Sequence, residues 1–229
     1  MQRLTLASLA AAILASGALP AAARDPGQGA AVCDERRFAP DAPTLRIGRT
    51  IGSGAILGYF EGDRQGCPET PSACLGTASI MPGAALLLDA ARADHVCAIF
   101  ADGQEARAGW LPRRRIAPAA RPVDPAPPLA AWVGTWRQYD NNIVLTREGG
   151  RIAAAGEAYW PAKNIMPANE GAFAGAAAPS GRRLQIADAP CEVEMTLAGD
   201  FLFVADNRMC GGHNASFLGI FVRRTDASK

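Results

Sequence analysis

The stretch CEVEMTLAGDFLFVADNRMCGGHNASFLGIFVRR, residues 191–224, decides the fold of the chain. Residues 191–197 alternate between apolar and polar side chains, which is the period of a β-strand with one face in solvent. Gly199-Asp200 is a turn signal, and residues 201–205 form an apolar returning strand. The stretch therefore predicts an antiparallel β-hairpin.

A two-residue loop in this hairpin places Leu197 opposite Leu202 and brings Cys191 within bonding reach of Cys210. A three-residue loop is the alternative and would shift the pairing by one residue. After Gly-Gly, residues 215–222 predict one more strand.

The first residues of the chain read as a signal peptide. Arg3 precedes an apolar run over residues 4–19, and the small residues that follow predict cleavage after Ala23. The first cysteine, Cys33, lies too far from this site for a lipid anchor. We therefore expect an exported protein, periplasmic or secreted, with a flexible leader over residues 24–44 and no membrane span.

Six cysteines in an exported chain predict three disulfides. Spacing favours two of the pairs and elimination gives the third: Cys67–Cys74, Cys191–Cys210 and Cys33–Cys97. A metal site is the rival interpretation, but the chain has no C-x-x-C motif and only two histidines, far apart in sequence. No metal site and no cofactor are predicted.

The charge of the chain excludes two classes of partner. Removal of residues 1–23 leaves 22 basic residues against 22 acidic ones. A neutral mature chain has no general electrostatic attraction for nucleic acid or for an anionic membrane. We expect a monomer that binds a polymer, a peptide or a protein of the cell envelope.

The N-terminal half contains short strand-like runs separated by Gly and Pro turns. These runs are residues 45–47, 56–60, 75–81, 84–88, 95–101 and 108–111. The turn Pro82-Gly83 and the late segment Gly109-Trp110-Leu111-Pro112 make residues 45–117 resemble bacterial Src-homology-3-like domains. This resemblance implies a small barrel whose aromatic side chains line a shallow cleft for peptides or wall material. Tyr59, Phe60 and Trp110 are the candidates here, and the alternative is that all three belong to the core.

Residues 118–130 are rich in Pro and Ala and predict a semi-rigid linker between two domains. The second domain, residues 131–225, has eight strand-like runs and no helical period. These runs are residues 135–139, 142–147, 151–159, 172–175, 183–187, 191–197, 201–205 and 215–223. The fold class is therefore all-β: a Src-homology-3-like small barrel joined to an eight-stranded antiparallel up-and-down β-barrel.

Two short segments at the ends of the second domain resemble the calycin pattern of lipocalins, avidins and fatty-acid-binding proteins. They are Gly134-Thr135-Trp136 and the final run that ends at Arg223. The resemblance implies a barrel closed by Trp136 with a basic side chain of the last strand over its ring. Arg223 and Arg224 are the two candidates, and alternation with Val222 favours Arg223. Through residues 210–217 this half also resembles C-terminal domains of uncharacterised exported proteobacterial proteins.

Ligand-binding candidates in the second domain are a loop and a set of small residues. The loop at residues 160–171 offers Trp160, Lys163 and Asn169, although it is equally well explained as a surface excursion. An eight-stranded barrel is either filled by side chains or holds one small ligand. Four alanines would leave a hollow if they point inward, or simply reflect composition: Ala153, Ala155, Ala172 and Ala174.

No catalytic residues are predicted. Glu192 and Glu194 share a strand face, but the alternation places that face in solvent. Cys210 and His213 are three residues apart, yet a disulfide would remove the thiol nucleophile. Ser180 lacks the helix that follows a nucleophile elbow. A hydrolase with acids that cannot be paired from sequence is the weakest hypothesis.

These observations predict an exported, non-enzymatic binding protein that engages cell-envelope material, peptide or a protein partner. The first alternative is an inhibitor of a cell-wall hydrolase of the lysozyme type, with residues 160–171 as the inserting loop. The second alternative is a carrier of a small hydrophobic ligand, which requires an open cavity in the C-terminal barrel.

Overall fold

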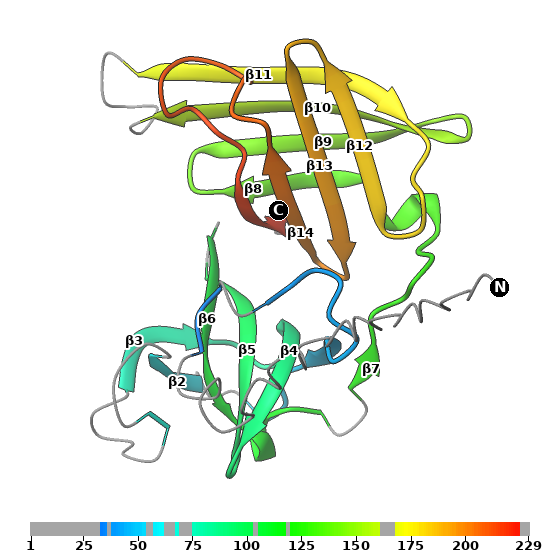
Figure 1. Cartoon of the computed structure of the whole chain (residues 1–229). Coiled ribbons are helices and arrows are strands. Elements are labelled where there is room, and N and C mark those ends of the chain that lie inside the picture. The colour runs from blue at the N-terminus through cyan, green and yellow to red at the C-terminus, as the bar shows by residue number, and fades with distance from the viewer. Residues whose placement is uncertain are drawn as a thin grey trace, which may run out of the picture.

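The described residues of the chain form two antiparallel β-sheets and contain short 3-10 turns but no α-helix (Figure 1). The computed structural model describes residues 33–35, 38–53, 57–61, 67–68, 75–102, 105–117, 120–160 and 168–224. The predicted signal peptide and most of the predicted leader lie outside these residues. Among the described residues, no helix has the length and hydrophobicity of a membrane span.

The N-terminal half is a sheet of seven strands in the order β3-β2-β6-β5-β4-β1-β7. Its strands are β1 (Arg46–Arg49), β2 (Leu57–Glu61), β3 (Leu75–Ile80), β4 (Ala85–Arg92), β5 (His95–Asp102), β6 (Glu105–Pro112) and β7 (Arg121–Pro122). β7 lies within the stretch predicted as a linker and pairs with β1, so this part of the connection belongs to the sheet.

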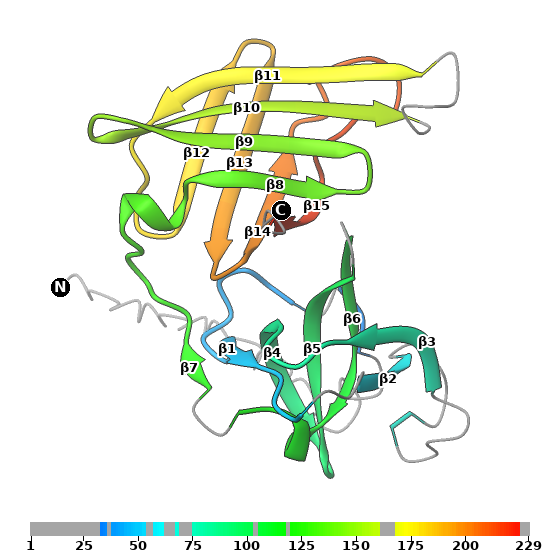
Figure 2. The same ribbon diagram turned by 180° about the vertical axis from the view of Figure 1, so that it is seen from behind.

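The C-terminal half is a nearly closed eight-stranded barrel in the order β11-β10-β9-β8-β15-β14-β13-β12. Its strands are β8 (Gly134–Gln138), β9 (Asn141–Glu148), β10 (Arg151–Trp160), β11 (Asn169–Ala177), β12 (Arg183–Asp188), β13 (Cys191–Ala198), β14 (Phe201–Asp206) and β15 (Gly219–Arg223). Consecutive strands are neighbours, and β15 returns to β8, as an up-and-down barrel requires. Figure 2 shows β8–β11 running across β12–β14, so the barrel is flattened into two layers.

The hairpin predicted from residues 191–205 forms with the expected two-residue loop. Leu197 lies opposite Leu202 in the register of β13 and β14, and Cys191 is bonded to Cys210. Gly199 has a φ of 66°, a left-handed conformation that suits glycine in a tight turn. The predicted strand over residues 215–222 is shorter than expected, because β15 begins only at Gly219.

Residues 207–218 cross one end of the barrel, and they are called the crossing segment below. The backbone N–H of Gly212 donates to the carbonyl of Glu170, and the N–H of Ala172 donates to the carbonyl of Cys210, both at 2.9 Å. A Cβ on Gly211 would lie 2.2 Å from Cα of Gly171, so only glycine permits this approach. The crossing segment thus pairs with the edge of β11, where the barrel is not closed by a strand ladder.

Side chains fill the interior of the barrel. The four alanines that would leave a hollow if they pointed inward do not line the interior: Ala153 is half-buried, and Ala155, Ala172 and Ala174 are exposed. At Gly156 an added Cβ would lie 2.3 Å from the ring of Phe173 and 2.8 Å from that of Phe217. The interior consists of one cluster that includes Trp132, Trp136, Ile143, Leu145, Ile152, Phe173, Leu184, Val193, Met195, Leu202, Phe217 and Phe221.

Arg223 closes the barrel as the sequence predicts. Its guanidinium lies over the ring of Trp136, 4.2 Å from the ring centroid. The same group donates to the carbonyl of Val133 at 2.6 Å, to the carbonyl of Ala131, and to Asp200 at 3.2 Å. One side chain from the last strand therefore ties the first strand, the chain before it and the hairpin turn together.

The two halves share a hydrophobic core. Phe201, Phe203 and Val222 point outward from the barrel and are nevertheless buried, because residues of the N-terminal sheet cover them. Trp110 of β6 is fully buried in this cluster, beside Ile99 of β5. The apolar returning strand of the hairpin is thereby explained: β14 is buried on both faces, one inside the barrel and one against the other half.

Two disulfides are present among the described residues, Cys33–Cys97 and Cys191–Cys210, both as predicted. Cys67 is also disulfide-bonded, and its predicted partner, Cys74, lies outside the described residues. The first bond attaches the chain before β1 to β5, and the second attaches the crossing segment to β13. Such bonds indicate an oxidising compartment, extracellular or periplasmic.

Candidate functional site

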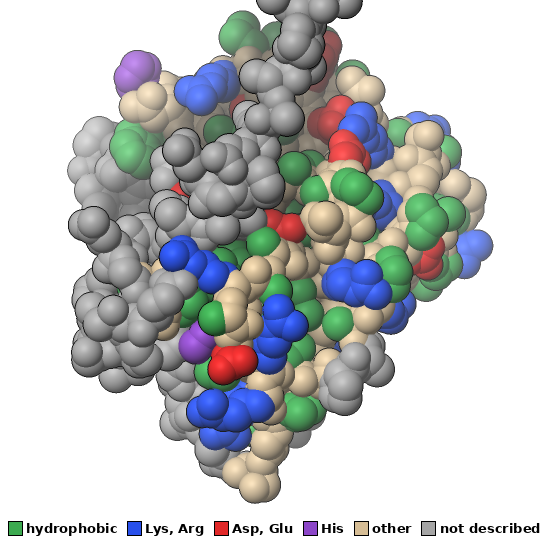
Figure 3. Space-filling view, turned by 60° about the horizontal axis from the view of Figure 1, so that its bottom comes forward, with side chains coloured by type: hydrophobic (Ala, Val, Ile, Leu, Met, Phe, Trp, Pro, Cys, Tyr) green, Lys and Arg blue, Asp and Glu red, His purple; other side chains and the backbone are tan. Residues whose placement is uncertain are grey.

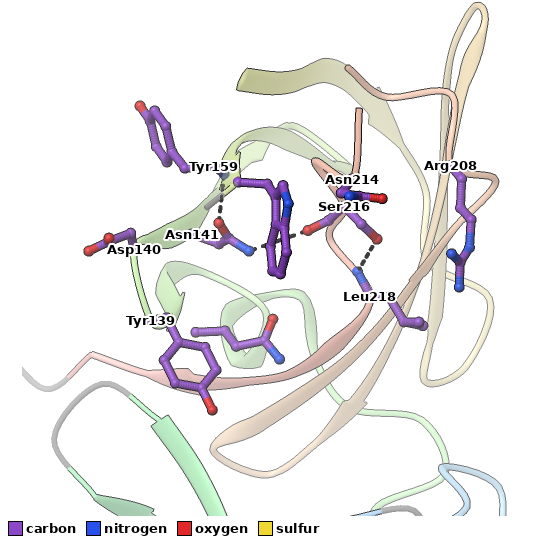
Figure 4. Close-up of a pocket in the computed structure, with 10 residues that line it drawn as sticks. Tyr139, Asp140, Asn141, Tyr159, Arg208, Asn214, Ser216 and Leu218 are labelled. Carbon is purple, nitrogen blue, oxygen red and sulfur yellow. Dashed lines mark hydrogen bonds between the residues drawn. The ribbon is translucent and has the colours of Figure 1, made fainter. Parts of the chain in front are cut away.

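A pocket of about 620 Å³ opens at one end of the barrel (Figure 4). Three parts of the chain meet there: the turn from β8 to β9, the C-terminal end of strand β10, and the crossing segment. The pocket is called the barrel mouth below. It is lined by Gln138, Tyr139, Asp140, Asn141, Tyr159, Trp160, Arg208, Asn214, Ser216 and Leu218.

Partly buried hydrogen bonds hold the frame of the barrel mouth. Asn141 accepts the backbone N–H of Tyr159 at 2.9 Å and donates to the carbonyl of Ser216 at 3.3 Å. This amide therefore joins three connections that are distant in sequence. Asp206 accepts the N–H of Phe217 at 2.5 Å and the hydroxyl of Ser216 at 3.0 Å. These contacts fix the crossing segment against the strand ends, so the mouth is preorganised.

Strained backbone is concentrated at the barrel mouth. Of the four non-glycine residues with positive φ in the described chain, three line this pocket: Tyr139 (54°), Arg208 (60°) and Asn214 (63°). Asparagine tolerates this conformation, but for a bulky residue such as tyrosine it costs about 1–3 kcal/mol. Residues retained in such a conformation cluster at ligand-binding sites, which makes the mouth the leading candidate site.

The exposed groups of the mouth combine aromatic rings with polar side chains. Tyr139 is 61% exposed and Trp160 is 50% exposed, so both rings offer faces to a ligand. Asp140, Arg208 and Asn214 also line the pocket (Figure 4). A few polar groups placed among aromatic surfaces are the usual lining of a binding pocket.

Tyr139 also faces the N-terminal half (Figure 4). Burial raises the pKa of its hydroxyl, the negative charges of Glu105 and Glu35 raise it further, and Arg107 opposes them. Burial likewise raises the pKa of Glu35, with Arg107 lowering it and Glu105 raising it. Since the ring of Tyr139 is mostly exposed, the burial acts on the hydroxyl end, where the two halves meet.

The structure places the residues predicted for binding in different environments. Trp160 lines the mouth, and Asn169 begins β11 beside the crossing segment, close to Gly212. Lys163 lies outside the described residues. Trp110 is fully buried between the halves, so its side chain is not available to a ligand.

The other two aromatic candidates, Tyr59 and Phe60, lie on β2, where the backbone of Phe60 pairs with that of Trp110. The remaining mouth residues were not singled out from the sequence. The sequence marked their neighbourhood only through the break between the strand-like runs 135–139 and 142–147, because a single sequence does not show which loops meet at one end of a barrel.

The mouth contains no assembled catalytic group. Cys210 is in a disulfide and therefore has no thiol to act as a nucleophile. Glu192 and Glu194 are exposed on the outer face of β13, as the alternation predicts. In the part of the chain that the structure describes, no three metal-ligating side chains come together.

Comparisons with models of protein families, with curated proteins and with solved structures found no match to this chain. The geometry of the site is therefore the basis for the function proposed below.

Proposed function

We propose that the protein is an exported, periplasmic, non-enzymatic binding protein whose barrel mouth engages cell-envelope material. The observation that carries this proposal is the pocket itself. It joins exposed aromatic rings to polar side chains on a strained frame held by partly buried hydrogen bonds. The N-terminal half covers the outer face of β14 and β15 and borders the mouth near Tyr139.

The chemistry of the mouth favours a glycan as the envelope ligand. The C–H faces of sugar rings pack on aromatic faces, and Tyr139 and Trp160 present such faces to solvent. Sugar hydroxyls require hydrogen-bond donors and acceptors nearby, and Asp140, Arg208 and Asn214 provide both. The likeness of the two halves to Src-homology-3-like domains and calycin-type barrels agrees with a binding role.

Co-sedimentation of the mature protein with purified peptidoglycan tests this proposal. Trp160→Ala and Tyr139→Ala should each weaken retention about tenfold, a loss of about 1.4 kcal/mol. Val144→Ala is the matched control, because Val144 is an exposed apolar residue on β9 outside the mouth. Retention that is equal for all three variants would refute the mouth as the binding site, and no retention of the unmutated protein would refute the ligand.

A second candidate function is inhibition of a lysozyme-type cell-wall hydrolase. It is favoured by exposed apolar side chains gathered at and beside the mouth: Tyr139, Trp160, Leu218, and Met209 next to Arg208. Contiguous exposed apolar surface with Trp, Tyr and Arg is typical of protein interfaces. A lysozyme turbidity assay separates the two functions. An inhibitor slows lysis when its concentration equals that of the enzyme, whereas a glycan binder slows lysis only in proportion to the fraction of the cell wall that it covers.

The filled interior of the barrel gives no support to the third idea, carriage of a hydrophobic ligand inside it. Native mass spectrometry of protein isolated from its own host would show an added mass if such a ligand were carried.

A further inference from the structure

A second cavity, of about 470 Å³, lies between the two halves and is lined by arginine. Arg49 and Arg121 come from the N-terminal sheet, and Arg223 comes from the last strand of the barrel. Asp200, in the turn between β13 and β14, is the one acidic residue of the lining. We call this cavity the arginine cleft.

The strand register explains why these arginines converge. Ile47 of β1 pairs with Arg121 of β7, and Arg49 follows two residues later on the same side of β1. The turn at Gly199 packs on Ile47, since a Cβ there would lie 2.8 Å from the Ile47 side chain. Both halves are thus needed to form the cleft.

The three guanidinium groups differ in how many hydrogen bonds they already make within the protein. Arg223 already donates to two carbonyls and to Asp200. Arg49 donates to the carbonyl of Gly83 and retains its other N–H groups. Among the described residues, the exposed guanidinium of Arg121 makes no hydrogen bond or ion pair. Arg49 and Arg121 are therefore the groups that can receive a ligand.

Charge and shape define that ligand. Three arginines and one aspartate give the cleft a net charge of about +2, which matches a phosphomonoester, with about −1.5 to −2 at pH 7, better than a carboxylate. The guanidinium fork also suits phosphate oxygens. Small residues in the lining, among them Gly48 and Ala117, allow close approach.

Arginines outside the cleft make the electrostatic potential around it more positive. Arg113–Arg115 lie in a 3-10 turn next to β1, where the carbonyl of Arg49 accepts the N–H of Ala117. Figure 3 shows several basic side chains, with acidic ones among them, on the face of the molecule that it presents. Like charges around a concave site raise the local concentration of an anionic ligand.

We propose that the arginine cleft binds the phosphate group of a small soluble phosphomonoester, for which glucose 6-phosphate serves below as the probe. A bilayer surface also carries phosphate, but a recess between two domains admits a single group and not a flat array of headgroups. Because both halves form the cleft, the bound ligand stabilises their packing as well. This inference is independent of the ligand at the barrel mouth.

The test is binding of glucose 6-phosphate to the mature protein, measured by isothermal titration calorimetry and thermal melting at constant ionic strength. Glucose 6-phosphate should bind and raise the melting temperature, whereas glucose and gluconate should not. Arg121→Gln should weaken binding about tenfold, since it removes a charged hydrogen-bonding partner. Arg114→Gln is the matched control, because Arg114 is exposed on the same side but does not line the cleft.

Four results would overturn the proposal. They are the absence of glucose 6-phosphate binding, equal binding of gluconate, equal losses in the two arginine variants, and binding to phosphatidylglycerol vesicles that glucose 6-phosphate does not displace. Equal losses in the two arginine variants would show that the ligand responds to the general positive charge of this side and not to a specific site. Vesicle binding that glucose 6-phosphate does not displace would show that the phosphate belongs to a lipid surface. Each variant is first compared with the unmutated protein by thermal melting, so that loss of binding is separated from loss of fold.

Discussion

A methyl group added at Gly156 should destabilise the protein, because it would enter a filled barrel. The Cβ would lie 2.3 Å from the ring of Phe173 and 2.8 Å from that of Phe217. These two rings pack edge to face with centroids 4.8 Å apart, so neither can move without disturbing the other. Overpacking of this kind costs about 1–3 kcal/mol. For a chain of this size that lowers the melting temperature by about 2–4 °C per kcal/mol.

The matched control is Gly150→Ala. Gly150 lies in the turn between β9 and β10, where an added Cβ meets nothing within 4 Å. This change should alter the free energy of unfolding by less than about 0.5 kcal/mol. Both variants are compared by urea unfolding with the disulfides intact, followed by far-ultraviolet circular dichroism and tryptophan fluorescence.

A double variant identifies the cause of the loss. Phe173→Leu removes the ring that the new methyl group would strike, so Gly156→Ala should cost less in that background than alone. If Gly156→Ala is as harmless as Gly150→Ala, the interior has spare room. The argument against ligand carriage inside the barrel would then fail.

Three further predictions concern contacts that join distant parts of the chain. Arg223→Ala should lower the free energy of unfolding by about 2–4 kcal/mol. Arg223→Lys should lower it nearly as much, because Lys lacks the planar guanidinium group that binds two carbonyls while lying over Trp136. A Lys variant that unfolds in urea like the unmutated protein would contradict this. Replacing Cys191 and Cys210 together by Ser should lower the free energy of unfolding by about 3 kcal/mol, as expected for a disulfide that closes a loop of this length. An unchanged midpoint of urea unfolding would refute this prediction. The folded-state pKa of Glu35 is raised, so its carboxyl stabilises the fold at pH values below its ordinary pKa of 4.5 and loses that contribution as the pH rises through the folded value. The Glu35→Gln variant should therefore have a higher melting temperature than the unmutated protein at pH 7, and the difference should be smaller at pH 4. A difference that does not change with pH would contradict a raised pKa of Glu35 in the folded state.

The strands of both halves were predictable because their signal is local. Alternation over residues 191–197 and the turn at Gly199 fix a hairpin whose register depends on only two loop residues. The contact between Trp136 and Arg223 is distant in sequence, and it was reached through the resemblance to calycin barrels. Physically it requires that the first and last strands be neighbours, which closure of the barrel imposes.

Contacts between the halves were beyond the sequence, because they depend on which faces meet. The outward side chains of β14, such as Phe201 and Phe203, are as apolar as the inward ones, but nothing local shows that β6 covers them. Trp110 was therefore weighed both as a cleft aromatic and as a core residue, and the structure confirms the second alternative. The crossing segment posed the same difficulty: residues 215–218 have the composition of a strand but lie across the barrel end, where the disulfide at Cys210 and the carboxylate of Asp206 hold them.

The candidate site was only partly visible for a related reason. Trp160 stood out as an aromatic residue beside a long loop, and the structure places it in the mouth. The left-handed conformations of Tyr139 and Arg208 leave no trace in composition, because neither residue type favours that region. Strain of this kind is imposed by the surrounding hydrogen bonds, so it becomes visible only once those bonds are located.

The neutral net charge of the mature chain is a sum over charges that lie in different places on the molecule. A neutral chain has no overall attraction for anions, but the sum conceals how charges are distributed. Here Arg49 and Arg121 face one interdomain cleft, whereas Glu35 and Glu105 gather near Tyr139 at another place where the halves meet. The packing of the N-terminal sheet against the barrel thus does two things at once. It buries the apolar outer face of β14 and β15, and it leaves arginines around one cleft and the carboxylates of Glu35 and Glu105, with Arg107 beside them, near Tyr139.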